Sequence, residues 1–414
     1  MIDTIMPKRF LTLCLYVIFY GCSQNSIDHS NIILIDANKK YPILELKLSE
    51  LADISYIALK TEGVIFGYSS AHRRLFVYRD KIFIGDRYMY DPKLVIYDRT
   101  GVPIQIIGSY GRGPGEYMNM NAFVVDTLTN EVTIYDNTQK KIIVYGIDGK
   151  FKREKNLEQI NRGQKSFEGI EIINDNYLLA YNNRSISIHE NDYYIDDSKQ
   201  LGREGQIVRY GKPIMIIDKQ TLTEVSYSNF EYAKPKIWDV RTINYNLTSS
   251  NDGVYITTER TDTIYFMNRN LEIIPKFRDI TDYGSQHVAR LFPAAETERY
   301  IFFSTEVGIK QGVVRVENTT PKRFFAYDKQ LQKIFRLDNG LTEKRDWNKE
   351  QIAISNNRVV LDQYSLTLNH NFASTFFSPE FLLEHYNQLP EELKVITKNL
   401  KVDDNPVIML IKFK

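Results

Sequence analysis

Residues 122–136, "AFVVDTLTNEVTIYD", predict a β-hairpin: an apolar run, a polar turn and a second apolar run. The pattern occurs six times, and the starts of successive second strands are 50, 45, 77, 46 and 58 residues apart. A period near 45 to 50 residues is typical of a propeller blade, which is a small four-stranded sheet. The six second strands begin at Ile82, Val132, Tyr177, Val254, Tyr300 and Arg358.

Further hairpins between these predict the outer halves of five blades. They cover residues 93–108, 141–156, 213–228, 263–278 and 323–338. The sixth blade lacks such a hairpin, but the chain ends in "NPVIMLIKFK" (405–414) and has "ISYIALKT" (54–61) near its start. Pairing of these two segments would close the ring and leave no sheet edge exposed there. The sequence therefore predicts an all-β fold, a six-bladed β-propeller with closure between the N- and C-terminal strands.

Two segments interrupt the period. Residues 182–206 are polar and rich in turn formers, which predicts a long loop on one face. Residues 378–400 read as helical, because Ser378 suits an N-cap, Pro379 suits a first turn, and Pro390 with two glutamates begins a second segment. We expect a short helical insertion near residues 379–400 that packs on the rim or a face of the propeller.

Composition favours β structure and excludes several classes of function. Aromatic residues make up 13% of the chain. The 53 Lys and Arg nearly balance the 52 Asp and Glu, so no global field holds a nucleic acid or an anionic membrane surface. The two cysteines, Cys14 and Cys22, leave the folded body without a thiol for a disulfide, a zinc site or a nucleophile.

The N-terminus predicts export. Lys8 and Arg9 precede an apolar run over 10–20 that is too short to span a bilayer, as in a signal peptide. The run ends in "FYGC", similar to a bacterial lipoprotein cleavage box with Cys22 as the lipidated residue. Ordinary secretion with nearby cleavage, or initiation at Met6, are the alternatives. We therefore expect a signal peptide over 1–21, a flexible tether over 22–40 and the propeller over 41–414.

The stretch "GSYGRGPGEY" (108–117) raises the question of a phosphate cradle. Gly108 and Gly113 have the spacing of a P-loop, but the lysine and hydroxyl residue that should follow are absent. The stretch also fails the dinucleotide pattern, and a strand follows it in place of a helix. The favoured interpretation is a link from the outermost strand of one blade to the innermost strand of the next. The alternative is that Arg112, Glu116 and Tyr117 contact a ligand near the central channel.

Four segments carry a resemblance to a known family. They are "LADISYIALKTE" (51–62), "GSYGRGPGEYMNMNAFVVD" (108–126), "RTDTIYFMN" (260–268) and "DDNPVIMLIKFK" (403–414). The chain resembles the six-bladed β-propeller lipoproteins of Bacteroides-like bacteria, which are related to NHL-repeat propellers. The resemblance implies a propeller in the cell envelope, at the outer membrane, on its periplasmic or its outer side. It implies no shared activity, so no catalytic residue is carried over.

Other candidate sites are weaker. Trp238 and Trp347, with Tyr193 and Tyr194, would suit a glycan surface, although most tyrosines alternate along strands as core residues do. Acidic residues at strand ends are common turn residues: Asp86, Asp91, Asp98, Asp126 and Asp136. The six histidines are scattered, and we predict no metal and no cofactor: His29, His72, His189, His287, His370 and His385.

The leading hypothesis is a non-catalytic, envelope-anchored binding protein that presents a propeller face to a glycan, a peptide or a protein partner. The alternative is a hydrolase or lyase acting on sugars or lactones at an axial acidic or metal site, which rests on fold analogy. A cluster of at least three acidic or histidine residues at the channel mouth would favour the enzyme. A third hypothesis is a structural subunit of an envelope complex, with an apolar patch near residues 379–400.

Overall fold

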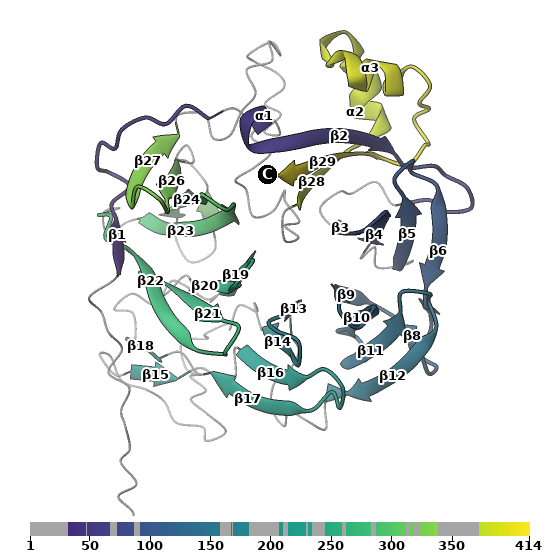
Figure 1. Cartoon of the computed structure of the whole chain (residues 1–414), viewed down its shortest axis with the longest axis horizontal. Helices are drawn as coiled ribbons and strands as arrows, with labels where there is room; N and C mark the ends of the chain where they lie inside the picture. Colours follow the sequence, from purple (N-terminus) through teal and green to yellow (C-terminus); the bar gives the residue numbers. More distant parts are fainter. Residues whose placement is uncertain are drawn as a thin grey trace, which may run out of the picture.

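The protein is a six-bladed β-propeller, as predicted (Figure 1). The computed structural model describes residues 32–46, 48–66, 73–86, 92–157, 167, 169–181, 207–209, 214–228, 231–233, 245–258, 262–282, 287–311, 315–317, 323–337 and 372–414. The predictions that lie outside these residues include the signal peptide with Cys22, the loop over 182–206 and the sixth hairpin over 352–363.

Each blade is one antiparallel sheet. Blade 1 contains β3 (Arg73–Tyr78), β4 (Lys81–Asp86), β5 (Lys93–Asp98) and β6 (Pro103–Ile107). Blade 2 contains β9 (Met120–Asp126), β10 (Glu131–Asp136), β11 (Lys141–Gly146) and β12 (Phe151–Asn156). Blade 3 contains β13 (Gly169–Ile172), β14 (Tyr177–Tyr181), β16 (Ile214–Asp218) and β17 (Glu224–Ser228).

The remaining blades follow in order around the ring. Blade 4 contains β19 (Tyr245–Ser250), β20 (Gly253–Thr258), β21 (Thr263–Asn268) and β22 (Ile273–Asp279). Blade 5 contains β23 (His287–Glu296), β24 (Tyr300–Gln311), β26 (Phe324–Asp328) and β27 (Lys333–Leu337), with β25 (Arg315–Glu317) paired to the far end of β24. Blade 6 contains β28 (Phe372–Phe377), β29 (Val407–Phe413) and β2 (Ala52–Ala58). A short pair, β15 (Ile207–Arg209) and β18 (Glu231–Ala233), lies outside the blades.

Hydrophobic side chains fill the spaces between blades. Because successive side chains point to opposite faces of a strand, one strand contributes to two cores. In β11, Ile142 and Val144 pack towards blade 3, against Ile170, whereas Ile143 and Tyr145 pack towards blade 1. This two-sided burial explains why the predicted strands read as continuous apolar runs.

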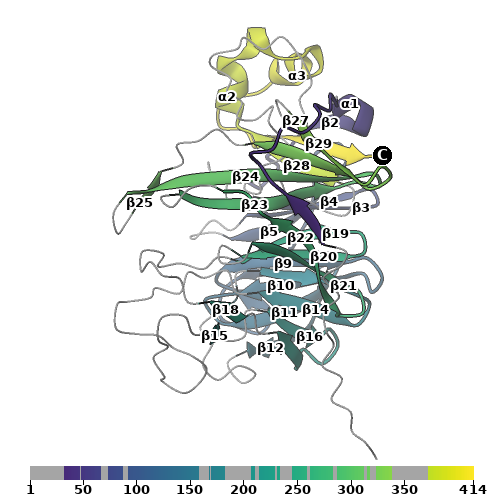
Figure 2. The ribbon, with the colours of Figure 1, turned by 90° about the vertical axis from the view of Figure 1, so that its left-hand side faces the viewer.

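The alternation of strand direction gives the ring two unlike faces. In blades 1 to 5, the turn after the first strand and the turn after the third lie together, and we call this side the short-turn face. The backbone N–H groups of Ile147, Lys219 and Lys329 donate to turn carbonyls of Asn130, Asn176 and Arg299. The other side, the loop face, carries the connections between second and third strands and the links between blades (Figure 2).

A two-residue motif builds the short-turn face. An Asp or Asn followed by a basic residue ends the third strand of four blades: Asp98–Arg99, Asp218–Lys219, Asn268–Arg269 and Asp328–Lys329. The first residue accepts backbone N–H bonds from its own turn, as Asp328 does from Gln330 and Leu331. The basic residue reaches a first turn or strand end, as Arg99 does when it donates to Arg79 O at 2.6 Å. For Asp98, Asp126 and Asp136, the predicted turn role is confirmed.

The ring closes as predicted. β2 pairs antiparallel with β29 in the register Ala52 to Phe413 through Ala58 to Val407, so the N-terminal strand is the outermost strand of the last blade. β28, which the hairpin pattern did not predict, pairs with the other edge of β29.

The expected tether over 22–40 is wrong in its C-terminal part. β1 (Ile33–Ile35) pairs parallel with β22 and becomes a fifth strand of blade 4. Ile35 is fully buried, because it packs against Phe277. The chain continues along blade 5, where Leu44 N donates to Arg336 O at 2.9 Å. A rim belt, residues 32–46, therefore joins the outer edges of blades 4 and 5 before β2 enters blade 6 (Figure 1).

The helical insertion is confirmed on the rim of blade 6 (Figure 1). It contains α2 (Pro379–Glu384), the 3₁₀ turn η4 (Tyr386–Gln388) and α3 (Glu391–Thr397), and α1 (Leu48–Leu51) precedes β2. Ser378 Oγ accepts from Phe381 N, as an N-cap does. Leu382, Leu389 and Leu393 are buried in the core of blades 5 and 6. Among the described residues, none of the helices has the length and apolar character to cross a membrane.

Candidate functional site

The glycine stretch is a link between two blades, as the favoured interpretation predicts. It joins β6 to β9 and contains a parallel pair of two-residue strands, β7 (Ser109–Tyr110) and β8 (Glu116–Tyr117). Gly115 has a φ of +69°, and a Cβ there would lie 2.9 Å from Cδ2 of Phe151. This position therefore needs glycine both for its backbone conformation and for its close approach to β12.

Polar side chains of blade 2 form hydrogen bonds with the backbone groups of the stretch. The N–H of Gly115 donates to Glu154 Oε2 at 3.0 Å, and the N–H of Met118 donates to Asp136 Oδ2 at 2.6 Å. Gln139 donates to Gly111 O, and Lys141 donates to Gly113 O. The stretch is therefore built as a joint, in which two backbone N–H groups already donate to carboxylates of the protein itself.

The three predicted ligand residues have different positions. Tyr117 is fully buried between blades 1 and 2, where its hydroxyl donates to Ile107 O at 2.9 Å and accepts from Leu94 N at 3.2 Å. The carboxylate of Glu116 accepts from Gly113 N at 2.7 Å, within its own loop. Arg112 is exposed, and its Nε donates to Met118 Sδ at 3.0 Å.

Their expected place near the central channel is wrong. The stretch lies on the loop face over the outer half of blade 2, because it contacts Lys141 at the start of β11 and Glu154 and Phe151 of the outermost strand (Figure 1). Of the three side chains, that of Arg112 is the one presented to solvent.

Near the axis of the ring lies a charged residue that the sequence interpretation missed. Glu171 lies on β13, the innermost strand of blade 3. Its neighbours Ile170 and Ile172 pack towards blade 2, so the Glu171 side chain points to the opposite side, where Ser249 of blade 4 hydrogen-bonds to it. Arg74, which also acts on its charge, belongs to blade 1. Blades 1 and 3 are not neighbours in the ring, so this interaction joins two non-adjacent blades.

The position of Glu171 favours its neutral form. Burial in the molecule raises the pKa of this carboxyl, and the charge of Arg74 and the hydrogen bond from Ser249 offset the rise only in part. The side chain is still partly accessible. Its sequence context, "GIEII", looks like an ordinary strand with one polar residue, so only its place on an innermost strand distinguishes it.

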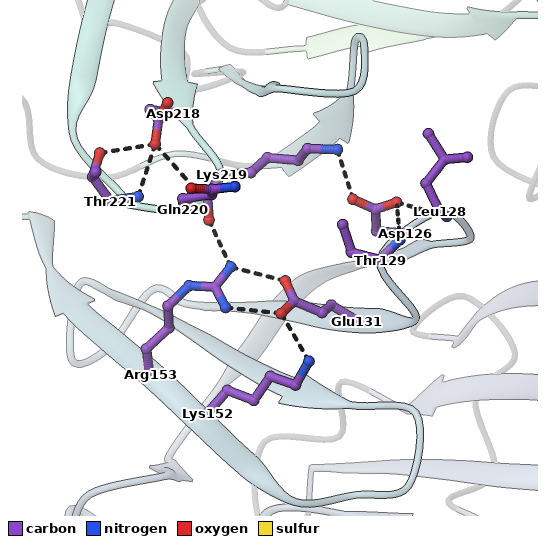
Figure 3. Close-up of polar contacts among 10 residues, drawn as sticks. All are labelled: Asp126, Leu128, Thr129, Glu131, Lys152, Arg153, Asp218, Lys219, Gln220 and Thr221. Atoms are coloured by element: carbon purple, nitrogen blue, oxygen red, sulfur yellow. Dashed lines mark hydrogen bonds and ion pairs between the residues drawn. The ribbon is translucent and has the colours of Figure 1, made fainter.

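On the short-turn face, a network of hydrogen bonds and ion pairs joins blade 2 to blade 3 (Figure 3). Lys219 Nζ lies 2.6 Å from Asp126 Oδ2, and both side chains are about nine-tenths buried. Arg153 donates to both oxygens of Glu131 and to Lys219 O. Burial alone would raise the pKa of Asp126, but the hydrogen bond and charge of Lys219 hold it below its usual value. Most polar atoms of these groups bond to one another, so we interpret the network as a junction that stabilises the contact of blades 2 and 3.

Among the described residues, no group of three or more His, Cys, Asp or Glu is placed to hold a metal ion. His385 stacks on Phe381 at a centroid distance of 4.5 Å in the helical insertion. The predicted glycan candidates Trp238, Trp347, Tyr193 and Tyr194 lie outside the described residues.

Comparisons with known proteins agree with the fold. A family model described as "Domain of unknown function (DUF4934)" matches residues 30–412, and no curated protein matches this sequence. One similar solved structure is that of a protein from Bacteroides fragilis NCTC 9343 whose name describes it as a presumed exported protein. Its sequence is 15% identical, its TM-score is 0.59, and the match covers 92% of this chain and 99% of that chain. A member of the DUF4221 family from Bacteroides vulgatus is 9% identical with a TM-score of 0.51, covering 91% of this chain and 99% of its own. At these identities the likeness shows the fold alone.

Proposed function

The chain belongs to the family of the domain of unknown function DUF4934, and on this premise we propose that it is an exported, lipid-anchored binding protein. Its loop face docks a macromolecular partner, a protein, a peptide or a glycan. Cys22 carries the lipid. The signal-peptide pattern and the "FYGC" box support export and anchoring, and the name of the B. fragilis structure agrees with export.

The difference between the two faces carries this proposal. On the short-turn face, tight turns are joined to one another by backbone bonds and by the Asp/Asn–basic motif. On the loop face, blades 5 and 6 have long connections: the arm formed by β23, β24 and β25, which projects beyond the ring, and the helical insertion (Figure 2). Binding residues commonly lie on loops held by a rigid scaffold, so the loop face is the binding face.

The loop face also exposes side chains suited to contact. Ile65 and Val402 are 64% and 59% exposed at the junction of blades 6 and 1. Tyr110, at 53%, and Arg112 lie on the glycine stretch. Tyr and Arg are enriched among residues that contribute most of the binding energy at interfaces.

The test uses the absence of cysteine after Cys22. A photo-reactive label is attached to single cysteines on the loop face (Ile65→Cys, Tyr110→Cys) and, as matched controls, on the short-turn face (Leu128→Cys, Leu331→Cys). All four positions are more than half exposed in the structure. The labelled proteins are irradiated in envelopes of the producing cells, and cross-linked species are identified by mass spectrometry. A glycan array probed with the same proteins tests for carbohydrate partners.

We expect one defined species to cross-link from the loop face and to be competed away by unlabelled protein. Equal cross-linking from both faces, or none from either face together with an empty glycan array, contradicts the proposal.

Glu171 favours a second candidate, an enzyme with an axial general acid. Burial raises the pKa of the Glu171 carboxyl, which is the direction of shift that a general acid requires. Hydrolysis of glycosides by the usual route needs a second carboxylate at a defined distance, and Glu171 faces Ser249 and Arg74. Turnover of a panel of lactones and glycosides that is lost in Glu171→Gln and kept in Glu62→Gln would establish the enzyme.

A further inference from the structure

The rim belt is the first described segment after the proposed lipid anchor, and its attachment bears on how the propeller lies relative to the membrane. This inference rests on the proposed lipid anchor at Cys22. The belt enters the ring at β1, which is the outer edge of blade 4. Ile35 is buried there, Ile280 N donates to Ile35 O at 2.9 Å, and Ala37 N donates to Thr281 Oγ1 at 2.7 Å. The first fixed point after the lipid is therefore on the rim of blade 4.

Further bonds keep the belt on the ring. Arg323 of blade 5 donates to Ala37 O and to Asn38 Oδ1, both at 2.8 Å. Arg336 exchanges backbone bonds with Pro42 and Leu44. Because contacts on two blades hold the belt, the point at which the lipid tether attaches to the propeller is blade 4 and not β2.

The tether between Cys22 and Ile32 is short compared with the ring. Ten residues span at most about 33–36 Å when fully extended. Four strands at about 4.8 Å spacing make a blade about 14 Å deep, so outermost strands of opposite blades lie at least about 30 Å apart across the channel. A tether that crossed a face to reach the far rim would use nearly its whole length. The charges of the chain nearly cancel, so no global field opposes the orientation that the tether sets.

We propose that the protein is held to its membrane by the rim of blade 4, so that blade 1, on the opposite side of the ring, is farthest from the lipid (Figure 1). Blades 6, 1 and 2 carry Ile65, Tyr110, Arg112 and Val402 on their part of the loop face. This surface therefore faces the aqueous compartment.

The test compares two exposed isoleucines in the outer parts of opposite blades. Ile274 on β22 of blade 4 and Ile104 on β6 of blade 1 are 40% and 48% exposed. The lipidated protein is extracted from membranes as Ile274→Cys and Ile104→Cys variants, labelled with one fluorophore, and reconstituted into phosphatidylethanolamine and phosphatidylglycerol vesicles that carry a headgroup quencher. Leu128→Cys and Tyr110→Cys report on the two faces in the same experiment.

We expect the Ile274 label to be quenched about two- to threefold more strongly than the Ile104 label, because the two strands are at least about 30 Å apart. The two face labels should lie between these values. Equal quenching of Ile274 and Ile104, or stronger quenching of Ile104, overturns the orientation.

Vesicle flotation tests the lipid anchor at Cys22 separately from the proposed orientation. If the wild-type protein floats with vesicles and the Cys22→Ser variant does not, the anchor is established whatever the quenching pattern. If neither protein floats, the anchor and the orientation both fall. Loss of partner cross-linking with the quenching difference intact would overturn the binding function alone.

Discussion

The side chain of Asn405 binds the backbone of Phe66 across the closure of the ring: its Oδ1 accepts from Phe66 N at 2.9 Å. Its Nδ2 donates to Val64 O at 2.7 Å and to Lys60 O at 3.2 Å. Asn405 is almost fully buried, so these bonds replace water that the amide would otherwise bind. Two segments about 340 residues apart in sequence are joined by one side chain.

Asn405→Ala is expected to lower the free energy of unfolding by about 2–3 kcal/mol, because it leaves buried backbone groups of Val64 and Phe66 without partners. Urea denaturation followed by tryptophan fluorescence measures the change. Asn399→Ala, an exposed asparagine after α3, is the matched control and should leave stability unchanged. Equal stability of the two variants would show that the bonds of Asn405 do not hold the closure.

Lys219→Met is expected to cost about 3–5 kcal/mol, since Asp126 would remain buried without its cation. The double variant Asp126→Asn with Lys219→Met should recover most of this loss. Asparagine keeps the Oδ1 acceptor that Leu128 N and Thr129 N use. Guanidinium unfolding of the single and double variants measures the coupling. If the losses are simply additive, the contact is not an energetic pair.

The network of blades 2 and 3 also predicts a pH dependence. The hydrogen bond from Arg153 holds the pKa of Glu131 below its usual value, and the bond from Lys219 does the same for Asp126 against the effect of burial. Stability from both groups is therefore present above the unfolded pKa values of about 4 and is lost as the pH falls below them. The slope of stability against pH in this range should become shallower in the double variant than in the wild type.

The contribution of Glu171 to stability should have the opposite pH dependence, which the Glu171→Gln variant can test. Burial raises the pKa of Glu171, so the folded state binds its proton more tightly than the unfolded state and loses stability as the pH rises above about 4.3. At neutral pH the glutamine variant should be more stable than the wild type, and the difference should vanish below about pH 4. Thermal unfolding across this range tests it, with the exposed Glu62→Gln as control. A Glu171→Gln variant less stable than the wild type at pH 7 would show that the ionised form is needed.

Gly115→Ala is expected to cost about 2 kcal/mol, because a left-handed residue with a Cβ is strained and Phe151 lies in contact distance. Gly113→Ala is the control in the same loop. A Cβ there meets only the end of the Glu116 side chain, and its φ is not in the left-handed region. Melting temperatures of the two variants give the comparison. A larger loss for Gly113→Ala would contradict the role of Gly115 as the close-packed joint.

Arg112→Ala is expected to leave the melting temperature within a degree or so of the wild type, since an exposed side chain with one weak bond to Met118 contributes little to stability. Partner cross-linking from the Tyr110→Cys label should fall when the two changes are combined. Unchanged cross-linking would remove Arg112 from the binding surface.

The blades could be predicted because the interactions that form them are local. Hairpins such as that of β9 and β10 are specified by turn residues and by adjacent apolar runs. The spacing of successive hairpins in the sequence indicated a ring of blades. β28 was missed because its segment, "FASTFF", has no hairpin partner beside it in sequence and pairs with β29 across the helical insertion. β1 was missed because three residues are too few for a pattern.

The candidate sites depended on three-dimensional position, which a pattern does not contain. Tyr117 looked available beside Arg112, but the packing of two blades buries it. Glu171 looked ordinary, but its strand is innermost and an arginine of a distant blade acts on it. The Asp/Asn–basic motif was present in four predicted hairpins, and its role became visible only when the carbonyls it binds were placed.

By itself the sequence determined the fold class, the order of the blades and the closure between the chain ends, because periodic hydrophobicity and turn chemistry act over a few residues. The tertiary structure decided which residues meet across blades. Asn405 with Phe66, Lys219 with Asp126 and Glu171 with Arg74 are pairs whose distance depends on the curvature of the whole ring, and no stretch of sequence records that curvature.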